Sequence, residues 1–270
     1  VNAAIVTSIA HWPPGHAETR LRARPFAAVA TDLDLDCETM PKPALVTELL
    51  ARCLCDDAHD GDTDGAREAL WQWNVVDRLQ GLLAIAYASN GAETTALAHC
   101  SDCRGQIELE LGLAGFVAES VETVDCTSPE GRRIRCRLPS GADLSAWMHD
   151  AAGDESWLAQ RLVIAVDDLP PERDWRMPEA WLAPIADALQ AADPLTALKL
   201  DVQCPFCGRA LAVEVDLESL LLTALGRRQR AVIEDVHRLA SNYHWNEAEI
   251  VAMPAWRRRR YLDRIQAEFT

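Results

Sequence analysis

The cysteines whose spacing could do chemistry form two C-x-x-C pairs, Cys100/Cys103 and Cys204/Cys207. Two thiolates in one tight turn can bind one metal ion, and Gly208 after the second pair allows the backbone to fold back. Because two thiolates are half of a tetrahedral site, the two pairs together predict one structural zinc ion per chain. Such an ion would join two segments that lie far apart in the sequence.

The two cysteine turns, called knuckles below, differ in sequence. The second is a C-P-x-C-G segment, Cys204–Gly208, whereas the first lacks the proline and its glycine, Gly105, comes one place later. The first turn can therefore differ in shape. His99, directly before the first pair, is a further candidate ligand.

Four reduced, buried cysteines without a metal ion, or a dithiol redox site, are the alternatives to zinc. A redox C-x-x-C motif needs a helix N-terminus that lowers a thiol pKa. Both pairs are followed by strand patterns instead, as in zinc ribbons, so redox chemistry is disfavoured. The other cysteines adjoin apolar residues and are interpreted as small core residues. They are Cys37, Cys53, Cys55, Cys126 and Cys136.

Alternating patterns typical of half-buried strands follow both pairs. After the first pair, apolar residues at 107, 109 and 111 alternate with Glu108 and Glu110. After the second pair, apolar residues at 211, 213 and 215 alternate with Glu214 and Asp216. Both segments are predicted to be strands that bury one face.

Upstream of these strands the chain repeats a short helix, an acidic loop and a second helix. Leu49–Cys53 parallels Leu158–Leu162, and Trp71–Leu83 parallels Trp181–Leu189. These likenesses predict an α+β fold with two tandem copies of a small α/β module, each with a zinc-ribbon-like knuckle. The predicted units are an N-terminal extension (1–29), a first module with a degenerate knuckle (30–126), a second module (127–225) and a C-terminal helical unit (226–270).

Composition argues against nucleic acid and membrane as general partners. The 270 residues include 26 Lys and Arg against 42 Asp and Glu, a formal net charge of −16, whereas affinity for phosphate needs clustered cations. The longest apolar run, Leu82–Ala88, is far shorter than the roughly 20 residues of a membrane helix. The first ten residues lack a basic leader, so we expect a cytoplasmic protein.

Motifs of common enzyme sites are not found in the sequence. It has no nucleophile elbow, phosphate-binding glycine loop, H-E-x-x-H motif or dinucleotide fingerprint. The seven histidines are scattered, and no pair of carboxylates stands out. The sequence predicts a protein without catalytic residues.

The last 45 residues predict a helical unit of opposite charge. From Gly226 onward nine basic residues accompany six acidic ones, so this segment is +3 and the remainder −19. Apolar residues at 232, 236, 239 and 243 predict an amphipathic helix. Asn246 and Glu249 have the spacing of a capping box, with Trp245 placed to pack on Ile250. A proline then starts a third helix.

Three segments, taken in order, resemble those of one known family. They are RLPSGADL (Arg137–Leu144), CPFCG (Cys204–Gly208), and LASNYHWNEAEI (Leu239–Ile250) followed by MPAWRR (Met253–Arg258) and Tyr261-Leu262. The family is that of T4-like phage baseplate hub assembly chaperones and their counterparts in contractile injection systems. The resemblance covers residues 130–270. In the first module the counterpart of the L-P-S-G turn is Glu38–Lys42, a departure from the pattern.

The resemblance implies a non-enzymatic assembly factor, either a chaperone or a minor structural component, for the baseplate of a contractile tail. Its partner would be a baseplate hub or wedge protein. Aromatic and arginine side chains of the helical unit are of the kind that anchor interfaces. The predicted partner-binding residues are Tyr243, Trp245, Trp256, Arg257, Arg258, Arg260 and Tyr261. The alternatives are a nucleic-acid-binding zinc-ribbon regulator and a dithiol oxidoreductase.

Overall fold

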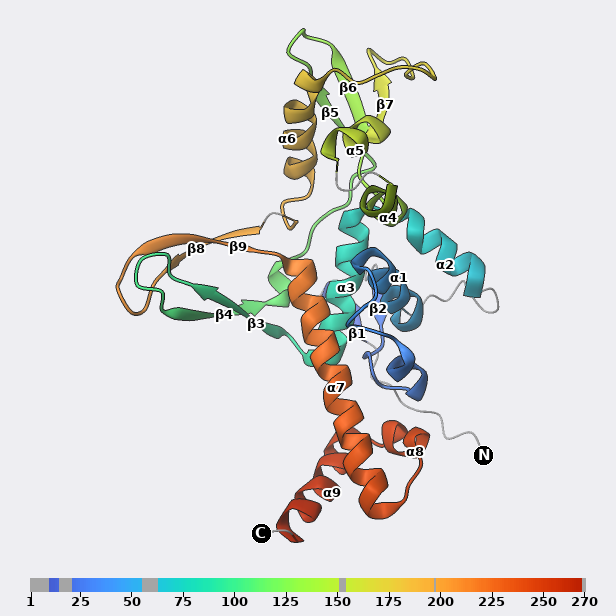
Figure 1. Ribbon diagram of the computed structural model, residues 1–270, viewed down its shortest axis with the longest axis vertical. Coiled ribbons are helices and arrows are strands. Elements are labelled where there is room, and N and C mark those ends of the chain that lie inside the picture. Colours follow the sequence, from blue (N-terminus) through green and yellow to red (C-terminus); the bar gives the residue numbers. More distant parts are fainter. Residues whose placement is uncertain (1–9, 15–20, 55–62, 151–153, 197, 269–270) are drawn as a thin grey trace.

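The computed structural model describes residues 10–14, 21–54, 63–150, 154–196 and 198–268, and every structural statement below concerns these residues. They form a mixed α/β protein with small antiparallel sheets. A central helical body carries three projections: a module of strands and helices, an arm of two β-hairpins, and a helical unit at the C-terminal end (Figure 1).

The central body is built around α3 (Val75–Asn90). Asn74 begins the helix by accepting a hydrogen bond from the N–H of Asp77 at 3.0 Å, and Gly91, at φ 92°, ends it. Most residues of α3 are buried, because other elements of the body pack around it. These are β1 (Ala10–Trp12), β2 (Leu21–Ala23), α1 (Lys42–Cys53), α2 (Thr63–Gln72) and the first half of α7 (Leu217–Tyr243).

The hairpin arm consists of β3 (Glu93–His99) with β4 (Gln106–Gly112), and β8 (Leu198–Gln203) with β9 (Ala210–Val215). The predicted strands after both knuckles are therefore confirmed. Their apolar faces pack on one another through Ile107 near the tip and through Leu111 and Val215 near the base. Each hairpin has two strands, and the four cysteines lie where the hairpins turn.

The second projection, called the upper module, is a three-stranded sheet with helices on it. Ile134, Leu162, Trp181 and Ile185 form its own buried core, which no residue of the central body joins. Its elements are β5 (Thr123–Thr127), β6 (Arg133–Arg137), α5 (Glu155–Leu162), β7 (Val163–Val166) and α6 (Leu182–Ala192). Helix α4 (Gly141–Asp150) lies between the two parts and packs mainly against α1 and α2 of the central body.

The L-P-S-G turn joins the upper module to the central body. Val75 donates a backbone hydrogen bond to Pro139 at 2.9 Å, and Gly141 donates one to Trp73 at 3.2 Å. A side chain at Gly141 would collide with the buried guanidinium of Arg78, since a Cβ there would lie 2.4 Å from Nη1. The glycine of this motif therefore permits close docking on α3.

Helix α7 crosses the predicted boundary at residue 226. It begins at Leu217, where Asp216 accepts a hydrogen bond from Ser219 N–H at 2.9 Å, and its first turns are buried in the central core. The C-terminal unit is thus not separate, because one continuous helix carries it. It is completed by α8 (Glu247–Ala252) and α9 (Ala255–Glu268). The capping box of Asn246 and Glu249 is confirmed.

Three further predictions about the first half of the chain are wrong. The helix expected over 71–83 is broken at Asn74, which caps α3. The segment 1–29 is no simple extension, since Trp12 and Phe26 are core residues. The repeated module order of strand, helix, acidic loop, helix, strand, knuckle and strand predicts a strand from about residue 30. Residues 30–34 form a 3-10 helix, η1, instead, and the strand β2 precedes them. The tandem duplication itself stays a prediction.

Candidate metal centre

The four predicted ligands come together at the tip of the hairpin arm. The Sγ atoms of Cys100, Cys103, Cys204 and Cys207 all lie within 4.8 Å of one another. Cys100 Sγ is 3.7 Å from Cys207 Sγ, and Cys103 Sγ is 3.6 Å from Cys204 Sγ. A tetrahedral ion with metal–sulfur bonds of about 2.3 Å would hold its ligands about 3.8 Å apart. The group could therefore hold a metal ion.

The two knuckles have the same backbone conformation despite their different sequences. Cys100 N–H donates to Gly105 C=O at 3.0 Å, and Cys204 N–H donates to Arg209 C=O at 2.8 Å. The residue after the second cysteine is left-handed in both, Arg104 at φ 59° and Gly208 at φ 73°. The first turn does not differ in shape as its sequence allowed. Arg104 instead adopts a conformation that costs a non-glycine residue about 1 kcal/mol or more.

Gly105, which comes one place later than the glycine of the second knuckle, does not provide the left-handed residue of its turn. A Cβ at this position would lie 2.5 Å from Cδ2 of Phe206, so the glycine makes room for the ring of the opposite knuckle. An ion pair of Arg209 Nη1 with Asp102 Oδ1 at 3.2 Å also joins the knuckles. The sequence signals for these contacts are the displaced glycine and the opposite charges of Asp102 and Arg209.

The knuckle backbone favours negative charge on sulfur. Amide N–H groups of Cys103 and Asp102 lower the pKa of the Cys100 thiol to about 7. At Cys207 the amide N–H of Arg209 has the same tendency, but burial and the neighbouring thiols outweigh it and raise the pKa to about 12. Repulsion between neighbouring thiolates opposes the ionisation of all four cysteines. A divalent cation would supply the compensating charge that four-sulfur ligation needs.

The remaining metal and cysteine predictions have mixed outcomes. His99 is exposed and does not join the four-sulfur group. Cys53 and Cys136 are buried core residues, as predicted, and burial raises the pKa of Cys136 to about 12. Cys37 and Cys126 are half-buried against the cores, and burial raises the pKa of both thiols. Cys55 lies outside the described residues.

The aromatic residues predicted to bind a partner form a local cluster in the C-terminal unit. Tyr243 stacks on Trp245 with ring centroids 4.7 Å apart, and Tyr261 meets Trp245 edge-on at 4.9 Å. All three are half-buried around Ile250 and so support the packing of α7, α8 and α9. Trp256 is different, being 62% exposed under the guanidinium of Arg260.

Arg258 is not free to bind a partner as predicted. Its side chain is 8% exposed, and Nη1 donates hydrogen bonds to the carbonyls of Val251 at 3.0 Å and Met253 at 2.8 Å. It holds the end of α8 against α9. The exposed cations of α9 are instead Arg257, Arg259, Arg260 and Arg264, of which the prediction included only two.

Comparison with known proteins identifies no relative: no protein-family model, no curated protein and no solved structure matches the chain. In the described part of the chain, no helix has the length and apolar character needed to cross a membrane.

Proposed function

We propose that this protein is a non-enzymatic assembly factor whose two hairpins are joined by one structural zinc ion. The observation that carries the metal part is the four-cysteine cluster, formed by residues about 100 positions apart in sequence. Four sulfur donors in tetrahedral spacing are typical of structural zinc sites, which leave no coordination position open for a substrate.

Metal content tests this part directly. Protein purified from zinc-replete cells should contain one zinc per chain, and Cys204→Ser should lose it. Cys126→Ser is the matched control, because Cys126 lies in β5 of the upper module and its loss should leave zinc binding unchanged. A chain that folds with four freely reactive thiols and no bound metal would exclude the proposed site.

The assembly role is proposed for the baseplate of a contractile tail, in a phage or an injection system. It is supported by the order of the L-P-S-G-A-D-L, C-P-F-C-G and C-terminal helical segments. In the structure, the first segment forms the turn that packs on α3, the second forms one of the two cysteine knuckles, and the third forms the aromatic cluster of the C-terminal unit.

Within this role, the exposed face of α9 is the proposed contact for a baseplate hub or wedge protein. Trp256 supplies an exposed aromatic side chain, and the neighbouring arginines favour an acidic partner surface. Co-purification with a hub or wedge protein, reduced by the double change Trp256→Ala and Arg260→Ala, is the expected result. Normal tail assembly in the absence of this gene would contradict the role.

A nucleic-acid-binding regulator is the second candidate, favoured by the four exposed arginines of α9. Binding to DNA that weakens steeply with salt would support it, and no retention at low salt would remove it. A dithiol oxidoreductase is favoured less, because Cys103 and Cys207 each lead into a strand, β4 or β9, and not into a helix.

A further inference from the structure

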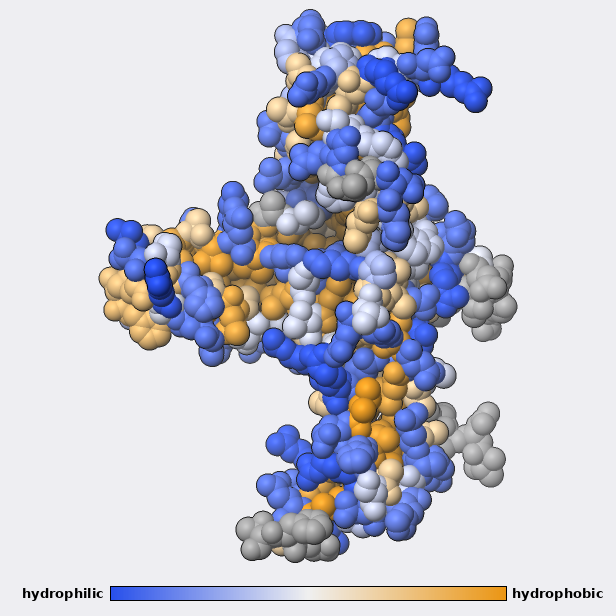
Figure 2. All heavy atoms as spheres, in the orientation of Figure 1, coloured by the Kyte–Doolittle hydropathy of each residue, from blue (hydrophilic) through white to orange (hydrophobic). Residues whose placement is uncertain are grey.

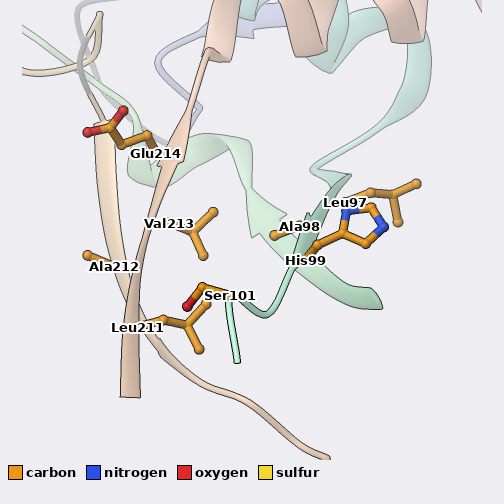
Figure 3. Close-up of a pocket in the computed structure, with 8 residues that line it drawn as sticks. All are labelled: Leu97, Ala98, His99, Ser101, Leu211, Ala212, Val213 and Glu214. Atoms are coloured by element: carbon orange, nitrogen blue, oxygen red, sulfur yellow. The ribbon is translucent and has the colours of Figure 1, made fainter. Parts of the chain in front are cut away.

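A groove of about 360 Å³ runs along one side of the hairpin arm, next to the cysteine cluster. Its walls are Leu97–His99 of β3 and Leu211–Glu214 of β9, with Ser101 of the first knuckle. Figure 3 shows Ala98 and Val213 pointing toward each other across it, whereas Leu97 and His99 point away. Apolar side chains gather over this arm on the face seen in Figure 2.

The groove follows the edges of two strands. Successive side chains of a strand point to opposite faces, so a cavity on one face is lined by every second residue. Here consecutive residues of both β3 and β9 line the cavity. It therefore lies where the backbone of each strand is accessible from the side.

The ladder of the first hairpin fixes which backbone groups point into this groove. Cys100 N–H donates to Gly105 at the tip, and Leu113 N–H donates to Ala92 at the base. Since hydrogen-bonded pairs alternate along an antiparallel ladder, the even-numbered residues of β3 are bonded to β4. Leu97 and His99 direct their N–H and C=O groups away from β4.

The second hairpin has the same arrangement. Cys204 N–H donates to Arg209 at the tip, so Val202 and Leu211 form the next bonded pair along the ladder. Ala212 and Glu214 direct their backbone groups away from β8. Among the described strands, β3 pairs only with β4 and β9 only with β8, so the outward groups of both strands have no strand partner.

These two edges lack the usual protection against strand pairing. Natural edge strands are blocked by central charges, prolines or bulges. Glu108 and Glu110 occupy the middle of β4, and Lys199 and Asp201 that of β8. Residues 94–98 of β3 and 210–213 of β9 contain no charge and no proline, and both ladders have continuous register.

We propose that the groove binds an extended segment of a partner protein, which adds as a third strand to the free edge of β3. β3 is the favoured edge because Leu97, 56% exposed, offers an apolar contact beside it, whereas Glu214 flanks β9. Main-chain hydrogen bonds would supply affinity, and alternate apolar side chains would contact Ala98 and Val213. Glu93, at the base end of β3, favours a basic residue at that end of the segment.

This surface goes beyond the proposed contact on α9, since the two lie on different projections of the molecule (Figure 1). The groove and the face of α9 can therefore bind their partners independently of each other. The test of the groove uses a peptide and the isolated protein, so its failure would leave the proposed assembly role standing.

The probe is a capped peptide of alternating threonine and valine with a lysine at each end, added to the metal-loaded full chain. The amide protons of Leu97 and His99 should exchange at least tenfold more slowly with saturating peptide. A peptide of the same sequence, N-methylated on the amides that face β3, should give no protection. Protection by both peptides, or at β9 alone, would overturn the assignment to β3, and no protection would overturn the docking site.

Variants of Leu97 give an independent test. Its N–H makes no bond to β4, so Leu97→Pro removes a donor from the groove without breaking the ladder. The expected result is at least tenfold weaker peptide binding, with Leu97→Val as the control that keeps the amide and binds within about threefold of the parent. Metal content shows whether each variant retains the arm. Equal binding by a metal-loaded Leu97→Pro protein would contradict the proposal.

Discussion

Two buried carboxylates each hold a turn by the same bidentate pairing with an arginine. Asp143, 4% exposed, accepts two hydrogen bonds from Arg137, and Asp32, fully buried, accepts two from Arg24. Asp143 also accepts the backbone N–H of Ser140 at 2.9 Å. Burial alone would raise the pKa of the Asp143 carboxyl, but the hydrogen bonds from Arg137 and Ser140 lower it to about 2.

Arg137→Ala should therefore leave the buried Asp143 carboxylate with a single, more distant cation, because the half-exposed Arg161 has its Nε 3.9 Å from Oδ1. Because Arg137 is itself 36% exposed, we expect a loss of about 2 kcal/mol in the free energy of unfolding, below the 3–5 typical of fully buried pairs. The matched control is Arg135→Ala, whose exposed pair with Asp125 should contribute less than about 1 kcal/mol. Urea unfolding at pH 7 measures both, and equal losses would contradict the assigned role.

The pH dependence of this effect follows from the direction of the pKa shift. Folding lowers the Asp143 pKa from 3.8 to about 2, so its stabilising contribution is present above about pH 4 and is lost as the pH falls toward 2. The difference in unfolding free energy between Arg137→Ala and the parent protein should narrow in that window. A difference that stays constant from pH 7 to pH 3 would show that the lost stability is packing alone.

At residue scale the sequence predicted that the four cysteines come together, but not the contacts that support the two knuckles. The C-x-x-C spacing is enough to predict a metal-binding turn, because metal ligation depends on the residue type and on a short turn. The contact of Phe206 with Gly105 depends on the opposite knuckle, which is about 100 residues away. The left-handed Arg104 stands where the second knuckle has a glycine. The pair of Arg24 and Asp32 is not predictable from the sequence, because its longer turn lacks the R-L-P-S-G-A-D pattern that surrounds Arg137 and Asp143.

At the scale of elements, Arg258 links α8 to α9. Its guanidinium satisfies carbonyls at the end of α8, and Nε lies 3.7 Å from Asp235 of α7. Arg258→Ala should leave these carbonyls unpaired, cost about 1–3 kcal/mol locally, and speed amide exchange across α8 and α9. Arg259→Ala, an exposed neighbour, should change neither. Unaltered exchange in Arg258→Ala would mean that aromatic packing alone holds the unit.

At this scale, the sequence predicts an element correctly when the residues that determine the element lie close together in the sequence. The capping box of α8 and the strands β4 and β9 were predicted, since both patterns are complete within a few residues. The start of α7 was not, because the apolar residues 217–225 look like the end of a module and their burial depends on α3. The break at Asn74 was missed because apolar spacing continues across it.

For the whole molecule, the cysteine cluster closes a loop that contains the entire upper module. The chain leaves the first knuckle at Cys103, builds β5 to α6, and returns to the second knuckle at Cys204. A cross-link that closes a loop of about 100 residues lowers the conformational entropy of the unfolded chain. By the chain-entropy model this raises the free energy of unfolding by roughly 4–5 kcal/mol. Metal ligation would therefore tie the hairpin arm together while the upper module keeps a core of its own.

If the four cysteines hold a metal ion, its removal should unfold the arm before the rest. The central core is built from α1, α3, α7 and the N-terminal residues, with no contribution from the knuckles, whereas the tip of the arm has only Ile107, Leu109 and Leu211 around Cys100 and Cys204. Chelation, or Cys204→Ser, should speed amide exchange throughout β3, β4, β8 and β9 and leave α3 protected. Cys126→Ser again serves as the control. Equal loss of protection in α3 and the arm would show that the metal stabilises one cooperative unit, and unchanged exchange in the arm would show that hairpin packing suffices without it.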